Sequence, residues 1–114
     1  MSKNPREEFL SMAGYSKIGS IGDLPPGSAM SADVAGTQVA IFNVDGTLHA
    51  IDEACSHVGG PLSKGVVTDT SVRCPLHGAS FDLITGEATG PPDCEAVKCY
   101  EVRVEGDEIQ VANP

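Results

Sequence analysis

The sequence is poor in basic residues. Only 7 lysines and arginines stand against 16 aspartates and glutamates, which gives the 114-residue chain a formal net charge of −9. So acidic a surface repels phosphate backbones, which argues against nucleic acid as a partner and favours a basic protein surface. The sequence also lacks a long hydrophobic run, since the longest, residues 39–42, is far too short to span a bilayer.

The N-terminus lacks the apolar segment of a secretory signal peptide, because residues 1–9 are mostly polar or charged. No membrane attachment is therefore expected, and the cytoplasm is the expected compartment, where thiols stay reduced. Four cysteines in such a chain indicate metal binding or thiol chemistry rather than a disulfide framework.

Glycine and proline are abundant, with 13 and 8 residues. This composition favours many turns between short strands and argues against a helical bundle. The chain length fits one domain, and β-rich segments at this spacing predict an antiparallel sandwich or small barrel. The predicted strands cover residues 15–21, 28–34, 38–44, 47–51, 66–68, 72–73, 79–83, 97–104 and 108–111. Hairpin turns are predicted at residues 45–46, 69–70 and 105–107.

Residues 1–14 read as an extension that precedes a single domain over residues 15–114. Asn4, Pro5 and Glu7 fit the start of a helix of about two turns, and a frayed tail is the alternative.

Two short segments carry the residues suited to metal chemistry. Cys55 and His57 form a C-x-H motif, and after sixteen intervening residues Cys74 and His77 form a C-x-x-H motif. Each motif begins where a predicted strand ends, so two loops offer a thiolate and an imidazole each to a common site. His49, by contrast, lies on a predicted hairpin strand and reads as structural or as a surface residue.

The order of the cysteines and histidines in the sequence helps to identify the metal that they bind. A zinc site can use two cysteines and two histidines, but zinc fingers place both cysteines before both histidines. Here cysteine and histidine alternate, which suits a two-iron cluster in which each loop gives one ligand to each iron.

With these motifs, the sequence resembles the soluble Rieske-type ferredoxins of ring-hydroxylating dioxygenase systems. The sequence is also similar to that family at residues 39–46, 85–87 and 91–96. The resemblance covers about residues 15–112. It implies a Rieske-type antiparallel β-sandwich with a small cluster-binding subdomain and one [2Fe–2S] cluster per chain. It also implies that Cys55 and Cys74 hold the buried iron, while His57 and His77 hold the outer iron.

The resemblance also gives expectations for the residues around the cluster. Gly90, Pro91 and Pro92 match the family's proline loop, which covers the cluster from a third side, and an ordinary surface turn is the alternative reading. Cys94 and Cys99 are not expected to be ligands or to form a disulfide. Cys99 is predicted to lie in the core, and Cys94 to pack beneath the proline loop.

Differences from the membrane-bound Rieske proteins of respiratory complexes predict a low reduction potential. Those proteins carry a second cysteine in each ligand loop, at positions that match Gly60 and Leu76 here, so their disulfide cannot form. They also hydrogen-bond the cluster sulfurs through a serine and a tyrosine, where this chain has Ala79 and Phe81. Without these donors, and with an acidic chain, the potential is expected near the low end of the roughly −150 to +300 mV Rieske range.

The resulting hypothesis is a monomeric one-electron carrier that is not itself an enzyme. It would take electrons from a flavin reductase and pass them to a terminal Rieske oxygenase of aromatic catabolism, with Asp52, Glu53 and Asp93 as candidate docking charges. Two alternatives remain. One is the Rieske-type small subunit of a larger oxidoreductase such as assimilatory nitrite reductase, and the other is a zinc-binding structural module.

Overall fold

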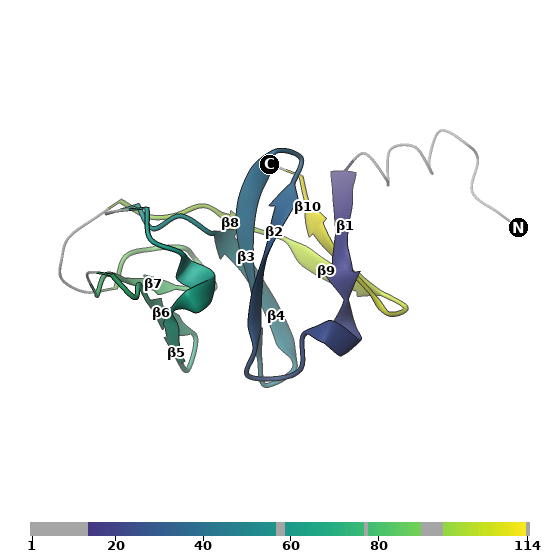
Figure 1. Cartoon of the computed structure of the whole chain (residues 1–114), viewed down its shortest axis with the longest axis horizontal. Helices are drawn as coiled ribbons and strands as arrows, with labels where there is room; N and C mark the ends of the chain where they lie inside the picture. The colour runs from purple at the N-terminus through teal and green to yellow at the C-terminus, as the bar shows by residue number, and fades with distance from the viewer. Residues whose placement is uncertain (1–13, 57–58, 77, 90–94, 114) are drawn as a thin grey trace, which may run out of the picture.

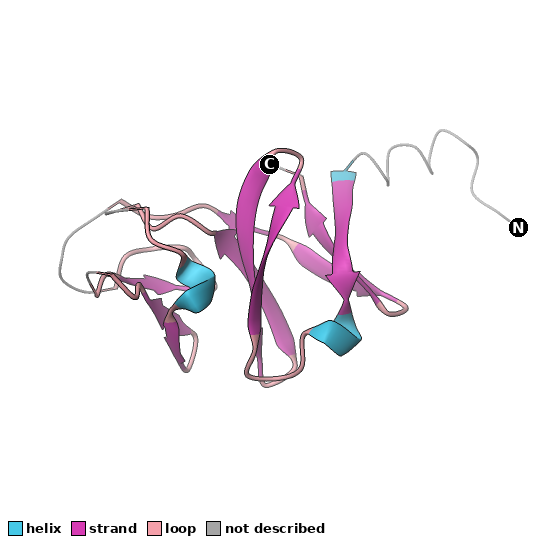
Figure 2. Ribbon diagram, in the orientation of Figure 1, coloured by secondary structure: helices cyan, strands magenta, loops and turns pink. Residues whose placement is uncertain are grey.

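The structure is a computed structural model and describes residues 14–56, 59–76, 78–89 and 95–113. Within these ranges the chain forms ten strands and two short 3₁₀ helices (Figures 1 and 2). In chain order they are β1 (Tyr15–Ser20), η1 (Ile21–Asp23), β2 (Ala29–Val34), β3 (Thr37–Val44), β4 (Thr47–Asp52), η2 (Leu62–Lys64), β5 (Val66–Thr68), β6 (Ser71–Arg73), β7 (Ser80–Asp82), β8 (Cys99–Tyr100), β9 (Val102–Glu105) and β10 (Glu108–Ala112). The predicted N-terminal helix lies outside the described residues.

The strands form three antiparallel sheets, which confirms the predicted all-β antiparallel class. The strand orders are β1-β10-β9, β2-β3-β4-β8 and β5-β6-β7. The first two sheets make up the base of the molecule. The third sheet and η2 form a loop subdomain, residues 53–89, which lies at one end of the base (Figure 1).

Strand β3 joins the two parts because it is buried on both faces. Val39 and Ile41 pack into the core of the base. Ala40 and Phe42, which point to the opposite face, pack into a second core that the base shares with the loop subdomain. The apolar run at residues 39–42 is therefore a doubly buried strand, and it fixes the loop subdomain to the base.

The hairpin between β3 and β4 turns at the predicted Asp45-Gly46 step. Both residues have positive φ, 52° and 94°, as a two-residue type I′ turn requires. The buried Asn43 supports the turn, because its Oδ1 accepts a 2.8 Å hydrogen bond from the Gly46 N–H. Its amide nitrogen donates a 2.8 Å bond to the Leu24 carbonyl, so both ends of the side chain are used.

The prediction of one continuous strand over residues 97–104 is wrong, because the structure has two separate strands there, β8 and β9. The chain changes sheets here, because β8 pairs with β4 while β9 pairs with β10. The prediction of a buried Cys99 is wrong for the same reason. This cysteine lies on the two-residue outer strand of its sheet and is exposed, while Val97, which precedes β8, supplies the core contact.

Candidate metal centre

The first ligand loop follows β4 and begins at Cys55. An isolated bridge between Ala54 and Pro61 closes its base. Inside it, the Cys55 N–H donates to the Gly60 carbonyl at 2.9 Å, and the Gly59 N–H donates to the Cys55 carbonyl at 2.7 Å. Gly59 has φ of 74°, a left-handed conformation that glycine adopts without strain. His57 belongs to this loop by sequence and lies outside the described residues.

The second ligand loop repeats the same hydrogen-bond pattern after β6. The Cys74 N–H donates to the Ala79 carbonyl at 2.6 Å, and the Gly78 N–H donates to the Cys74 carbonyl at 3.2 Å. Gly78 has φ of 77°, close to the value of its counterpart in the first loop. His77 is likewise a member of the loop by sequence that the structure does not describe.

The two loops share a sequence signal beyond their cysteine and histidine residues. In both loops, a glycine follows the cysteine at the fourth position, which gives a shared C-x-x-x-G pattern. The cysteine opens a tight turn, the glycine closes it, and the histidine lies between them in sequence. Each loop is thus a turn held by backbone hydrogen bonds, which fix the position of its cysteine.

The structure brings the two cysteines together. Cys55 and Cys74 are buried, with 3% and 2% exposure, and both belong to the core beneath the loop subdomain. The Cys74 Sγ lies against the first loop, since a β-carbon at Gly60 would stand only 2.8 Å from it. No disulfide joins Cys55 to Cys74. Two buried thiols in one core, each on a turn held by backbone hydrogen bonds, suit soft thiolate ligation of a metal.

Gly60 and Leu76, the positions that match the second cysteines of membrane-bound Rieske proteins, also lie beside each other. A β-carbon at Gly60 would stand 3.0 Å from both Cγ and Cδ1 of Leu76. The leucine side chain occupies the space next to Gly60.

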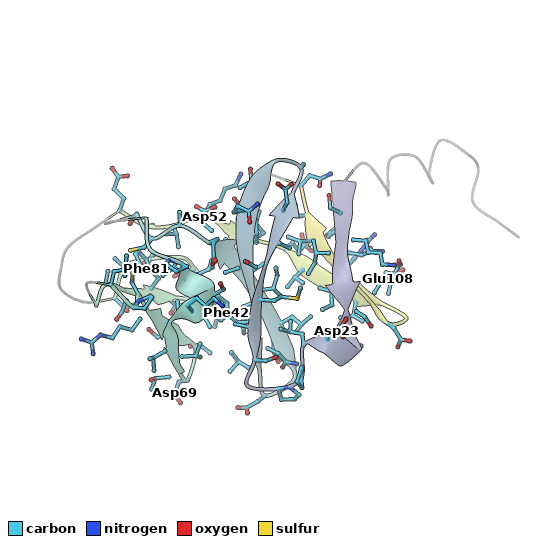
Figure 3. The ribbon with its side chains drawn as sticks, in the orientation of Figure 1. Asp23, Phe42, Asp52, Asp69, Phe81 and Glu108 are labelled. Atoms are coloured by element: carbon cyan, nitrogen blue, oxygen red, sulfur yellow. The ribbon has the colours of Figure 1, made fainter. Side chains whose placement is uncertain are left out.

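Two of the three acidic residues expected to guide docking, Asp52 and Glu53, have structural partners. The Glu53 carboxylate accepts bonds from the Ser63 N–H at 2.8 Å and the Ser63 hydroxyl at 2.7 Å, which ties the first loop to η2. Asp52, near the junction of the two parts in Figure 3, accepts bonds from the Tyr100 hydroxyl at 2.6 Å and the Lys98 N–H at 2.9 Å. Asp93 and the proline loop at residues 90–92 lie outside the described residues, as does Cys94.

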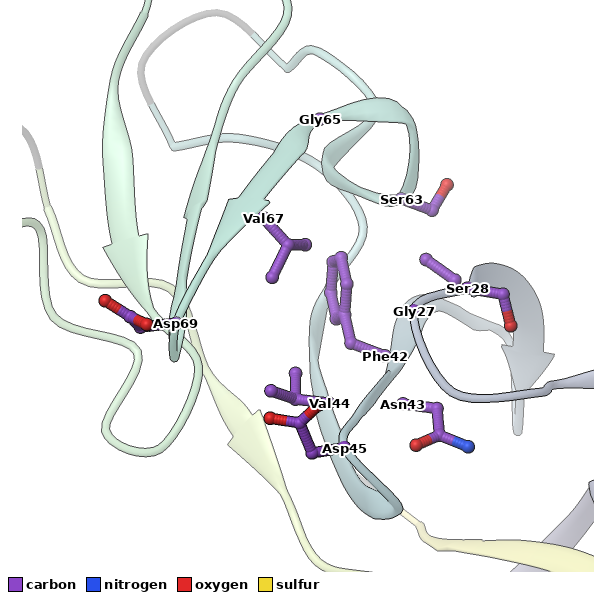
Figure 4. A pocket seen from close by; sticks show the side chains of 11 residues that line it. Gly27, Ser28, Phe42, Asn43, Val44, Asp45, Ser63, Gly65, Val67 and Asp69 are labelled. Atoms are coloured by element: carbon purple, nitrogen blue, oxygen red, sulfur yellow. The ribbon is translucent and has the colours of Figure 1, made fainter.

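A separate hollow of about 410 Å³ lies between the base and the loop subdomain (Figure 4). Phe42, Val44 and Val67 contribute apolar surface to it, and Asp45 and Asp69 contribute carboxylates. Neither ligand cysteine lines this hollow, so it is not part of the candidate metal centre.

The sequence matches the family of the Rieske [2Fe-2S] domain over residues 14–101. The chain belongs to the Rieske family. It is 39% identical over 98 residues to the biphenyl dioxygenase ferredoxin subunit of Pseudomonas sp. (strain KKS102), covering 85% of this chain and 90% of that one. Among solved structures, the ferredoxin of carbazole 1,9a-dioxygenase from Nocardioides aromaticivorans IC177 superimposes with a TM-score of 0.84 at 33% identity, covering 89% and 99% of the two chains.

Two further solved structures are of similar proteins that belong to larger assemblies. One, with a TM-score of 0.80 at 27% identity and coverage of 86% and 92%, comes from a complex of reduced oxygenase and oxidised ferredoxin in carbazole 1,9a-dioxygenase. The other is a putative NADH-dependent nitrite reductase small subunit from Mycobacterium tuberculosis, with a TM-score of 0.78 at 28% identity and coverage of 88% and 95%.

Family membership confirms the predicted [2Fe–2S] cofactor. The relatives are ferredoxin subunits, which confirms an electron carrier rather than a catalytic component. The buried pair Cys55 and Cys74 fits the cluster, because a Rieske centre needs two thiolates on one of its irons. In the part of the chain that the structure describes, we find no helix long and apolar enough to cross a membrane.

Alanine at Gly60 is expected to disturb the Rieske site. Its methyl group would press on the Sγ of the buried Cys74, and on Leu76, which is 58% exposed and can move. We expect Gly60→Ala to lower the iron content per chain and to destabilise the fold by about 1–3 kcal/mol, the usual cost of overpacking. Metal analysis and urea unfolding measure both effects. Gly22→Ala is the matched control, because a β-carbon there would make only an ordinary contact, with the Ser20 Oγ 3.9 Å away. Equal behaviour of the two variants would contradict the packing argument.

The Tyr100–Asp52 bond predicts a loss of stability at alkaline pH. Burial of the phenol raises the Tyr100 pKa above its usual value, and the hydrogen bond to Asp52 and that residue's charge raise it further. The folded pKa lies above the unfolded value, so the contribution is complete below about pH 10 and declines as the pH rises above it. Urea unfolding from pH 8 to 11 is expected to show this decline in the wild type and in Tyr15→Phe, and a weaker decline in Tyr100→Phe. An unchanged slope in Tyr100→Phe would contradict it.

Proposed function

We propose that this chain is a one-electron carrier that takes electrons from a flavin-dependent reductase and delivers them to a terminal Rieske oxygenase in the breakdown of aromatic compounds. It does so as a monomer in the cytoplasm, with one low-potential [2Fe–2S] cluster in a domain over residues 15–114 that an N-terminal extension precedes. The observation that carries the proposal is the pair of matching ligand loops, which place Cys55 and Cys74 in one core.

In this proposal, Cys55 and Cys74 bind one iron, and His57 and His77 bind the other. When bound, the cluster supplies a site that accepts and releases one electron. The loop turns hold the thiolates in fixed positions, so little reorganisation accompanies the change of charge. Burial of both sulfurs keeps water from them. The identity of 39% to a biphenyl dioxygenase ferredoxin subunit supports the choice of an oxygenase as acceptor.

Optical and EPR spectroscopy of the purified protein, before and after dithionite reduction, test the cofactor and its ligands. A coloured protein whose reduced form gives the anisotropic EPR signal of a histidine-ligated [2Fe–2S] cluster supports the proposal. His57→Cys and His77→Cys should replace that signal with one typical of all-cysteine ligation. A colourless, EPR-silent protein that holds zinc without labile sulfide would show that the ligands serve a structural module instead.

A small subunit of nitrite reductase is the second candidate, because the Mycobacterium tuberculosis structure matches with a TM-score of 0.78. The two functions differ in association. A carrier should purify alone and bind its oxygenase only transiently, whereas a subunit should co-purify with a large catalytic chain from its native source. Stable co-purification at high salt would therefore favour the second candidate.

A further inference from the structure

Arg73 holds its positive charge against the second ligand loop. It is the last residue of β6 and directly precedes Cys74. Its guanidinium lies over Gly78, since a β-carbon on that glycine would stand 2.9 Å from Nη2 and 3.1 Å from Nε. The absence of a side chain at Gly78 is what lets the charge approach the loop backbone so closely.

In the described part of the chain, this charge has no carboxylate as an ion-pair partner. Between residues 53 and 97, the sequence contains only two basic residues, Lys64 and Arg73. Among the described residues, no carboxylate lies within ion-pair distance of the Arg73 guanidinium; the ion pair that they contain joins Lys17 and Glu108 at 3.1 Å, on β1 and β10. The residue opposite Arg73 on β5 is Val66, which is apolar and 66% exposed.

We propose that Arg73 sets the reduction potential of the cluster, raising it above the value that the rest of this acidic chain would give. The inference rests on the proposed function, because it needs a cluster on Cys55, Cys74 and their histidines. A Rieske centre with two thiolates and two neutral imidazoles is neutral when oxidised and carries one negative charge when reduced. A fixed positive charge beside one ligand loop stabilises the reduced form more than the oxidised form, and so favours reduction.

Arg73 suits this role because a guanidinium stays protonated at every working pH. Its position is also defined by the loop rather than by a flexible ion pair, since the planar group lies against the Gly78 backbone. The interaction is partly screened, because the side chain is exposed. The effect on the potential should therefore be moderate and should shrink as salt is added.

A charge series at position 73 tests the proposal. The midpoint potential of the loaded protein is measured by spectroelectrochemical titration for the wild type, Arg73→Lys, Arg73→Gln and Arg73→Glu, at low and high ionic strength. We expect Arg73→Gln to lower the equilibrium constant for reduction of the cluster about threefold. For a one-electron couple, this lowers the midpoint potential by about 30 mV. Arg73→Glu should shift the midpoint about twice as far in the same direction, and Arg73→Lys should retain most of the wild-type value.

Lys17→Gln is the matched control, because it removes one positive charge from β1, on the far side of the base from the loop subdomain (Figure 1). A shift in Arg73→Gln no larger than in Lys17→Gln, or one that does not increase in Arg73→Glu, would overturn the role of Arg73. Failure of the wild type to bind a [2Fe–2S] cluster would instead overturn the proposed function, so the two failures are distinguishable.

Discussion

Serine at Cys74 is expected to give a protein that holds almost no iron or labile sulfide. Cys74 is 2% exposed and its sulfur lies against the first ligand loop, so neither water nor another side chain can take its place without rearrangement. A serine hydroxyl is a hard and weakly acidic ligand, whereas iron–sulfur clusters are held by soft thiolates. Cys55→Ser should lose iron and labile sulfide in the same way, because Cys55 holds the equivalent position in the other loop. Iron and sulfide analysis, together with the visible spectrum, measures the loss.

Cys99→Ser is the matched control for this pair. Cys99 is the other free cysteine among the described residues, but it is exposed on β8 and lies outside the core shared by the ligand cysteines. We expect this variant to keep the full iron content of the wild type. A loaded Cys74→Ser, or an iron-free Cys99→Ser, would show that the ligand set has been assigned wrongly.

The elements that the sequence predicted best depend on local interactions. The turn at residues 45–46 and the β5–β6 hairpin at residues 66–73 are fixed by a few neighbouring residues. The failure over residues 97–104 has a distant cause. The split into β8 and β9 depends on pairing with β4 and β10, which are remote or follow later in the chain. Hydrophobic alternation within the segment cannot reveal such a change of sheet.

The candidate site shows the same contrast. The residue types and spacing of the two motifs predicted a metal centre, because few other arrangements use cysteine and histidine in this way. The contact between Gly60 and Leu76, and that between Arg73 and Gly78, arise only when the two loops and β6 are placed in space. These contacts carry no periodic signal. They decide how tightly the site is packed and which charge lies beside it.

Adding two hydroxyl groups to the core that contains Cys55 and Cys74, with Ala79→Ser and Phe81→Tyr together, is expected to raise the midpoint potential by on the order of 100 mV. Each hydrogen bond to a cluster sulfur is stronger in the reduced state, and a difference of about 1 kcal/mol per bond is about 40 mV for one electron. Ala79 and Phe81 are fully buried in the core that contains both ligand cysteines, so a new hydroxyl there has few competing partners. Redox titration of the double variant and of each single variant measures the shift.

Stability provides the second readout for the same variants. A buried hydroxyl without an acceptor costs about 1–3 kcal/mol, whereas one that reaches a cluster sulfur recovers much of that cost. Phe42→Tyr is the matched control, because Phe42 is buried in the same core but comes from β3 rather than the ligand loops (Figure 3). We expect this control to leave the potential unchanged. A double variant that is destabilised with no change in midpoint would show that residues 79 and 81 do not face the cluster sulfurs. The expectation of a low potential would then lose the part of its argument that rests on residues 79 and 81.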